Sequence, residues 1–131
     1  MKFRFCALVI GCWVTTPSHA MGYSTTYVSC INAAGSSTST IAECMHDEFN
    51  IQNKRVKYYF KIILDQYASS EKKAQKKIQK QWFISRDTSC GKKNRSQSDG
   101  HFLRYYSCAL KSTVQQANNL ERQTYRYRSV D

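Results

Sequence analysis

The sequence lacks the residue arrangements on which most enzymes depend. It contains no glycine-rich phosphate loop and no Cys-x-x-Cys pair, and it has only three histidines. His19 lies in the first twenty residues, and neither His46 nor His101 has a partner at the spacing of a catalytic triad or a metal site. With no acid–base pair, activated nucleophile or metal set, we expect a protein that is not an enzyme and that holds no metal or other cofactor.

Long apolar segments are also absent. The one apolar run, residues 5–14, is shorter than the roughly 20 residues that a membrane-spanning helix needs. It follows Lys2 and Arg4 and precedes a small-residue site that ends at Ala20, an order typical of a secretory signal peptide. We therefore predict a signal peptide over residues 1–20, cleavage after Ala20, and a periplasmic or secreted protein. The residues before Cys12 resemble a bacterial lipobox, so a lipoprotein anchored at Cys12 is the alternative.

Acidic residues are scarce. The chain has 9 of them against 20 lysines and arginines, a net charge of +11. Two basic residues leave with the signal peptide, so the remaining 111 residues carry +9, a field that attracts polyanions. That length is enough for one small domain.

Four cysteines remain after cleavage: Cys30, Cys44, Cys90 and Cys108. An even number in an exported chain predicts two disulfides. The spacing does not suit zinc, which favours closely spaced pairs. Three pairings are possible on this count alone.

Hydrophobic periodicity predicts three helices. Residues 21–39 are rich in Ser, Thr and Gly, so we expect an N-terminal loop there. Thr40 and Glu43 form a capping-box pattern, and the apolar residues that follow repeat at helical spacing to about residue 67.

A second helix is expected from a cap at Ser70 to about Ser89, with Gly91 placed to end it. A third is expected from Asp99 to about residue 122, followed by a frayed basic tail over 123–131. The predicted fold is all-α: an antiparallel helical hairpin or three-helix bundle over residues 40–122, stapled by two disulfides.

The second predicted helix carries a distinctive polar and aromatic face. At about 100° per residue, Gln79, Trp82 and Arg86 lie on one side of it. Arg86 is placed to stack on Trp82 or to pair with a carboxylate. We interpret this face as a clamp between helices, with a ligand site as the alternative.

This segment also carries a family resemblance. Gln79, Trp82, Arg86-Asp87 and Cys90 follow the spacing Q-x-x-W-x-x-x-R-D-x-x-C, which resembles the central motif of the LprI-like lysozyme-inhibitor family of exported bacterial proteins. The segments on either side of this motif also resemble the family, in the same order along the chain, over residues 30–121. The matching flank positions are Cys30, Cys44, Val56, Phe60, Leu64, Cys108, Thr113 and Leu120.

The resemblance implies a non-enzymatic binder or inhibitor of lysozyme or another wall hydrolase. Three positions depart from the family pattern: Lys57, Phe60 and Gln116 stand where the family has Asn, Tyr and Arg. Local geometry then favours pairing Cys30 with Cys44 and Cys90 with Cys108. The net positive charge opposes binding to a basic lysozyme, and an acidic group of Glu43, Asp47 and Glu48 offers a local contact.

A lysine cluster gives the alternative function. Its members fall within an arc of about 140° on the second helix, and they are Lys72, Lys73, Lys76, Lys77 and Lys80. A solvated helix face is the simpler interpretation. The functional one is a cationic module that binds envelope polyanions or anionic lipids, with no specific nucleic acid expected.

Overall fold

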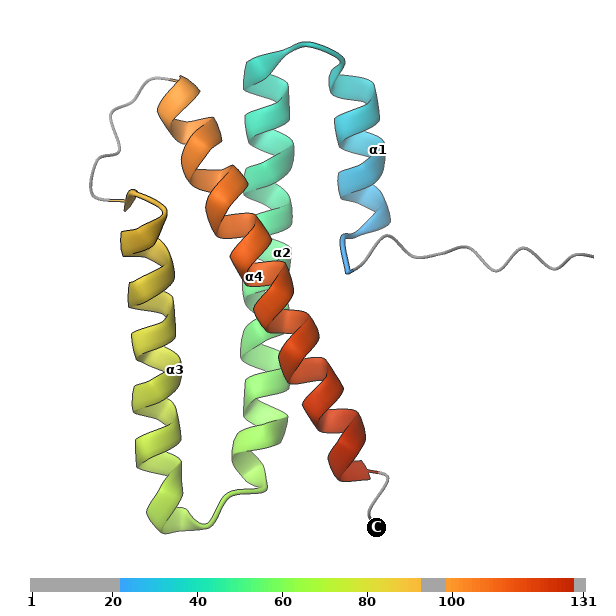
Figure 1. Ribbon diagram of the computed structural model, residues 1–131. Helices are drawn as coiled ribbons and strands as arrows, with labels where there is room; N and C mark the ends of the chain where they lie inside the picture. The colour runs from blue at the N-terminus through green and yellow to red at the C-terminus, as the bar shows by residue number, and fades with distance from the viewer. Residues whose placement is uncertain (1–21, 93–98, 129–131) are drawn as a thin grey trace, which may run out of the picture.

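One long central helix organises the fold. The structure is a computed structural model that describes residues 22–92 and 99–128; the predicted signal peptide, its cleavage site and Cys12 lie outside these residues. The described parts of the chain form helices and no strand, which confirms the all-α fold class. The helices are α1 (Thr25–Ala34), α2 (Thr38–Asp65), α3 (Ser69–Ser89) and α4 (Asp99–Arg128) (Figure 1).

Helix α1 lies where the sequence predicted a loop, so that prediction is wrong for residues 25–34. Ser24 caps the helix, and its hydroxyl accepts a hydrogen bond from the backbone N–H of Tyr27 at 3.1 Å. Tyr27 stacks on Tyr23 and packs against the core. A ten-residue helix is too short to be stable alone. Its packing beside α2 therefore stabilises it, despite its Ser- and Thr-rich surroundings (Figure 1).

Helices α2 and α3 begin at caps other than the predicted ones. The N-cap of α2 is Ser37, whose hydroxyl accepts from the backbone N–H of Thr40, so the predicted capping box at Thr40 is wrong. Helix α3 begins at Ser69, and Ser70 is not its cap. There the carboxylate of Glu71 accepts from the backbone N–H of Ala68 at 3.3 Å, which satisfies a donor that the helix start would leave free.

The ends of α3 and α4 differ in how well they were predicted. Helix α3 ends at Ser89, followed by Gly91 at a φ of 80°, a left-handed conformation that favours glycine after a helix. Helix α4 continues to Arg128, beyond the predicted end near 122. The reason is burial: Thr124 is only 2 % exposed, so the helix still packs against the domain in that turn.

The core lies where α4 crosses α2 (Figure 1). One cluster forms around Phe49 of α2, packed against α4 through Tyr105, Tyr106, Ala109, Leu110 and Val114. A second joins Val56 and Ile63 of α2 to Ala117 and Leu120 of α4. Helix α3 adds little to this core, because only Gln79 and Arg86 are buried along its 21 residues.

Two disulfides tie neighbouring helices together, with the predicted pairing. Cys30–Cys44 joins α1 to α2, and Cys90–Cys108 joins the end of α3 to α4. Cys108 lies off the apolar face of α4, yet α4 continues through it without a break. The second disulfide therefore holds α3, a helix whose two buried residues are both polar.

Candidate functional site

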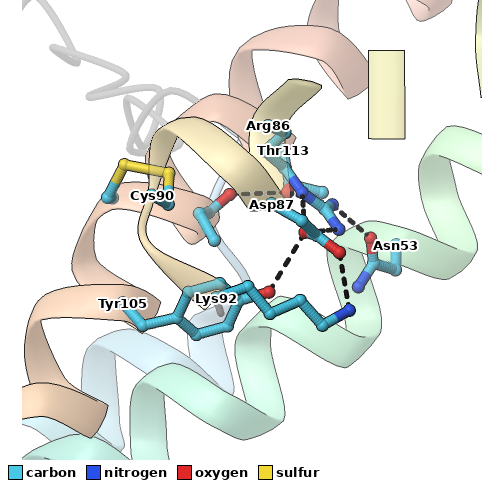
Figure 2. Close-up of polar contacts among 9 residues, drawn as sticks. Asn53, Arg86, Asp87, Cys90, Lys92, Tyr105 and Thr113 are labelled. Carbon is cyan, nitrogen blue, oxygen red and sulfur yellow. Dashed lines mark hydrogen bonds and ion pairs between the residues drawn. A yellow bond between two sulfur atoms is a disulfide. The ribbon is translucent and has the colours of Figure 1, made fainter. Parts of the chain in front are cut away.

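Arg86, near the end of α3, connects three helices (Figure 2). Its side chain is 5 % exposed. Its Nη1 donates to Oδ1 of Asn53 on α2 at 2.8 Å and to Oγ1 of Thr113 on α4 at 2.9 Å. Its Nε and Nη2 both donate to Oδ1 of Asp87, at 3.0 and 2.7 Å. One guanidinium thus fixes α3 against both α2 and α4.

Aromatic rings surround the same guanidinium. The Cζ atom of Arg86 lies 4.7 Å from the ring centroid of Phe49, 5.3 Å from that of Trp82 and 5.1 Å from that of Phe83. Each such contact adds roughly 0.5–2 kcal/mol, more where water is excluded. Arg86 therefore makes both contacts predicted from the sequence: it stacks on Trp82 and pairs with a carboxylate.

The carboxylate of Asp87 accepts hydrogen bonds from three residues. Besides Arg86, it accepts from Nζ of Lys92 at 2.6 Å and from the hydroxyl of Tyr105 on α4 at 3.1 Å. Partial burial would raise the pKa of Asp87, but the hydrogen bonds and the guanidinium charge lower it below the ordinary value. For Tyr105, burial together with the negative charge of Asp87 raises the pKa to about 12. The carboxylate is thus ionised and the phenol protonated at neutral pH.

Three members of this network were not found as site residues from the sequence. They are Asn53, Tyr105 and Thr113. Thr113 lies on the apolar face of α4 and is completely buried, and its hydroxyl also donates to the backbone carbonyl of Ala109 at 2.6 Å. A threonine on an otherwise apolar face was the available signal. Asn53 and Tyr105 gave none, because their role depends on where α3 docks.

Trp82 and Gln79 lie on the same face of α3 as Arg86, about one and two helical turns before it. Trp82 is partly buried and packs against the second core cluster. Gln79 is 8 % exposed, and its Nε2 has no hydrogen-bond partner among the residues that the structure describes. A buried donor left unpaired costs about 1–3 kcal/mol, so Gln79 is an unusual residue to bury.

A second polar cluster joins α2 to α4 through Glu121. Its carboxylate accepts a hydrogen bond from the hydroxyl of Tyr59 at 2.6 Å and forms an ion pair with Arg55. Partial burial would raise the pKa of Glu121, but the two donors and the charge of Arg55 outweigh that and lower it.

The lowered pKa of Glu121 predicts that the folded domain loses stability in acid. Because the folded pKa of Glu121 lies below its ordinary 4.5, unfolding takes up a proton. The contribution of the Glu121 carboxylate to folding stability is therefore complete above the ordinary pKa of 4.5. It is lost as the pH falls through the lower pKa of the folded state. We expect Glu121→Gln to be less stable than wild type at about pH 6, with the gap closing towards about pH 3 in urea titrations. The exposed Glu43→Gln should follow wild type within about 0.5 kcal/mol. A gap that stays constant with pH would contradict the assignment.

The start of the described chain docks on α2 through a buried carboxylate. Glu48 is 1 % exposed and accepts from the backbone N–H of Ser24 and from Nε2 of Gln52. Gln52 and Arg55 also donate to the carbonyl of Gly22. The predicted acidic contact surface is therefore wrong for Glu48, which is used inside the fold.

A groove lies between α2 and α3. Its volume is about 610 Å³, and its lining residues are Asn50, Asn53, Lys54, Lys57, Phe83 and Arg86. Neither the groove nor its α2 wall could be predicted from the sequence, because both depend on the placement of α3 beside α2.

The predicted lysine cluster lies on α3, away from the Arg86 network. Four of its five members are exposed: Lys73, Lys76, Lys77 and Lys80. Lys72 is partly buried, with its Nζ 3.9 Å from a carboxylate oxygen of Asp65. This cluster forms a largely solvated cationic face.

Other kinds of site are absent from the described residues. No three His, Cys, Asp or Glu side chains within 22–92 and 99–128 come together to hold a metal ion. None of the helices there is long and apolar enough to cross a membrane.

A family model described as "Lysozyme inhibitor LprI" matches residues 30–120. The match takes in all four disulfide cysteines and the complete network around Arg86. No curated protein and no solved structure matches the chain.

Proposed function

Because the chain belongs to the LprI family of lysozyme inhibitors, we propose that it is an exported bacterial protein that binds and inhibits a cell-wall hydrolase, either lysozyme or another enzyme of that class. The family match over residues 30–120 carries this proposal, since it spans α2, α3 and almost all of the core. The family is a class of inhibitors without catalysis of their own, which agrees with the lack of a catalytic constellation in the sequence.

The architecture supports an inhibitor that acts by occupying a surface. Two disulfides and the Arg86 network hold all four helices in one arrangement. A preorganised binder loses little conformational freedom on association, which favours tight binding by a small protein. The family match supports a protein partner over the cationic envelope module, for which the α3 lysines are the basis.

Export is part of the proposal. Disulfides persist in oxidising compartments, so the two observed here support a periplasmic or secreted location. We propose cleavage after Ala20, which leaves Met21 as the first residue. Mass spectrometry of the protein from its native envelope tests this. A diacylglyceryl-modified chain beginning at Cys12 would show the lipoprotein alternative instead.

The inhibition itself is measurable by turbidity. We expect residues 21–131, with both disulfides formed, to slow the clearing of bacterial cell walls by a sensitive hydrolase in proportion to dose. Because the domain carries +9, a hydrolase with an acidic cleft should be inhibited more strongly than a basic lysozyme. Unchanged clearing by both enzymes at molar excess and low salt would count against the proposed function.

A further inference from the structure

The α2 wall of the groove is a single polar helix face. Asn50, Asn53, Lys54 and Lys57 follow positions i, i+3, i+4 and i+7, so they line one side of α2, away from its apolar face. Phe83 and Arg86 of α3 form the opposite wall. The groove therefore combines three cations and two amides with one aromatic ring, and of the cations Arg86 is already paired with Asp87.

The two lysines of the groove have no acidic partner in the part of the domain that the structure describes. Lys54 and Lys57 are exposed, and neither ammonium has a carboxylate within 4.0 Å among the described residues. Residues three apart on a helix have Cβ atoms about 5–6 Å apart, so the like charges repel by a few tenths of a kcal/mol. An anionic group in the groove would relieve this repulsion.

The amide of Asn53 is oriented towards the groove by the buried network. Its Oδ1 accepts from Arg86, so its Nδ2 is directed away from the guanidinium, as Figure 2 shows. Asn53 lines the groove on the same face of α2 as Lys54 and Lys57, so its Nδ2 offers the groove an N–H donor. A carboxylate entering there meets one positioned N–H donor and two positive charges.

The α3 wall favours a peptide over a plain anion. Phe83 lines the groove and is partly exposed. An apolar ring next to donors and cations suits acidic side chains with their aliphatic stems. The continuous lysines of the outer α3 face, by contrast, suit a repeating polyanion.

We infer that the groove between α2 and α3 receives an acidic segment of the protein partner, with two carboxylates paired to Lys54 and Lys57. The identity of the partner as a wall hydrolase rests on the proposed function.

The direct test uses a capped acidic hexapeptide, Ac-Glu-Tyr-Glu-Asp-Leu-Glu-NH2, as the probe. We expect its titration into ¹⁵N-labelled residues 21–131 to shift the side-chain amide signals of Asn50 and Asn53 most. K54E/K57E should weaken the affinity at least tenfold. K76E/K77E makes the same change in net charge on the outer face of α3, and it should weaken the affinity less than threefold.

A second variant separates binding from folding. Asn53→Asp keeps an oxygen acceptor for Arg86 but replaces the Nδ2 donor with a carboxylate oxygen that faces the groove. We expect a melting temperature at or above that of wild type, with peptide affinity at least fivefold lower. Unchanged affinity in Asn53→Asp would overturn the role of this amide.

The remaining outcomes distinguish the alternatives. Equal losses in K54E/K57E and K76E/K77E would overturn the groove in favour of diffuse electrostatic attraction. A loss of binding to phosphatidylglycerol vesicles in K54E/K57E, without loss of peptide binding, would overturn it in favour of a lipid surface. Full hydrolase inhibition by K54E/K57E would overturn the groove as the contact while leaving the proposed function intact. Groove-specific peptide binding by a domain that inhibits no hydrolase would support the groove and overturn the function.

Discussion

Replacing Arg86 with alanine is expected to lower the free energy of unfolding by about 3 kcal/mol. The substitution leaves the acceptor of Asn53 and the hydroxyl of Thr113 without their shared donor, and Asp87 without its buried cation. Breaking a buried ion pair by removing one partner typically costs about 3–5 kcal/mol. The lower end applies here, because Asp87 keeps Lys92 and Tyr105. Urea denaturation of the oxidised domain measures the change.

Two further variants serve as controls for the Arg86→Ala measurement. Arg86→Lys keeps the charge, but one ammonium nitrogen cannot occupy the separate positions of Nε, Nη1 and Nη2, so it should recover only part of the loss. Arg104→Ala removes an exposed arginine of α4 and should change stability by no more than about 0.5 kcal/mol. If Arg86→Ala were as mild as Arg104→Ala, the network would not hold α3 in place.

Removing the second disulfide, as C90S/C108S, is expected to cost about 3 kcal/mol. The disulfide closes a loop of 18 residues, and opening a loop of that size restores roughly this much entropy to the unfolded chain. The native state should also change locally. Helix α3 buries only Gln79 and Arg86, so without the disulfide it should open before α2 and α4 separate. Hydrogen exchange measures both the global loss and the local opening.

The other disulfide provides the comparison. C30S/C44S opens a 14-residue loop, so its global cost should be similar. Local opening should then appear in α1, with the amides of α3 still protected. Equal protection of α3 in C90S/C108S and C30S/C44S would contradict the view that the second disulfide anchors α3.

Much of the fold could be predicted because the helical spacing of apolar residues can be recognised in a single sequence. The apolar repeats of α2 and α4 placed both helices, and the even cysteine count with short separations gave both disulfides. Helix α1 was missed because its stability comes from the Ser24 cap and from packing on α2, neither of which composition reveals. The extension of α4 was missed because the burial of Thr124 depends on tertiary packing.

The candidate site could be predicted only in part, for a related reason. Trp82, Arg86 and Asp87 lie close together on one helix, so the sequence showed them as a group. Their partners Asn53 and Thr113 come from two other helices, and nothing local assigns them to Arg86. Lys54 and Lys57 appeared only as a polar helix face, and they became part of a groove once α3 was placed beside them.

The order of the disulfides along the chain has a consequence for biosynthesis. Each cysteine pairs with its neighbour in sequence, over 14 and 18 residues, whereas Cys44 and Cys90 are 46 positions apart. Loop-closure entropy favours the shorter loops by about 1 kcal/mol. Oxidation as the chain emerges, first cysteine to second and third to fourth, therefore yields the native bonds directly. This protein should reach its oxidised form with a simple thiol oxidant, without an isomerase to reshuffle mispaired cysteines.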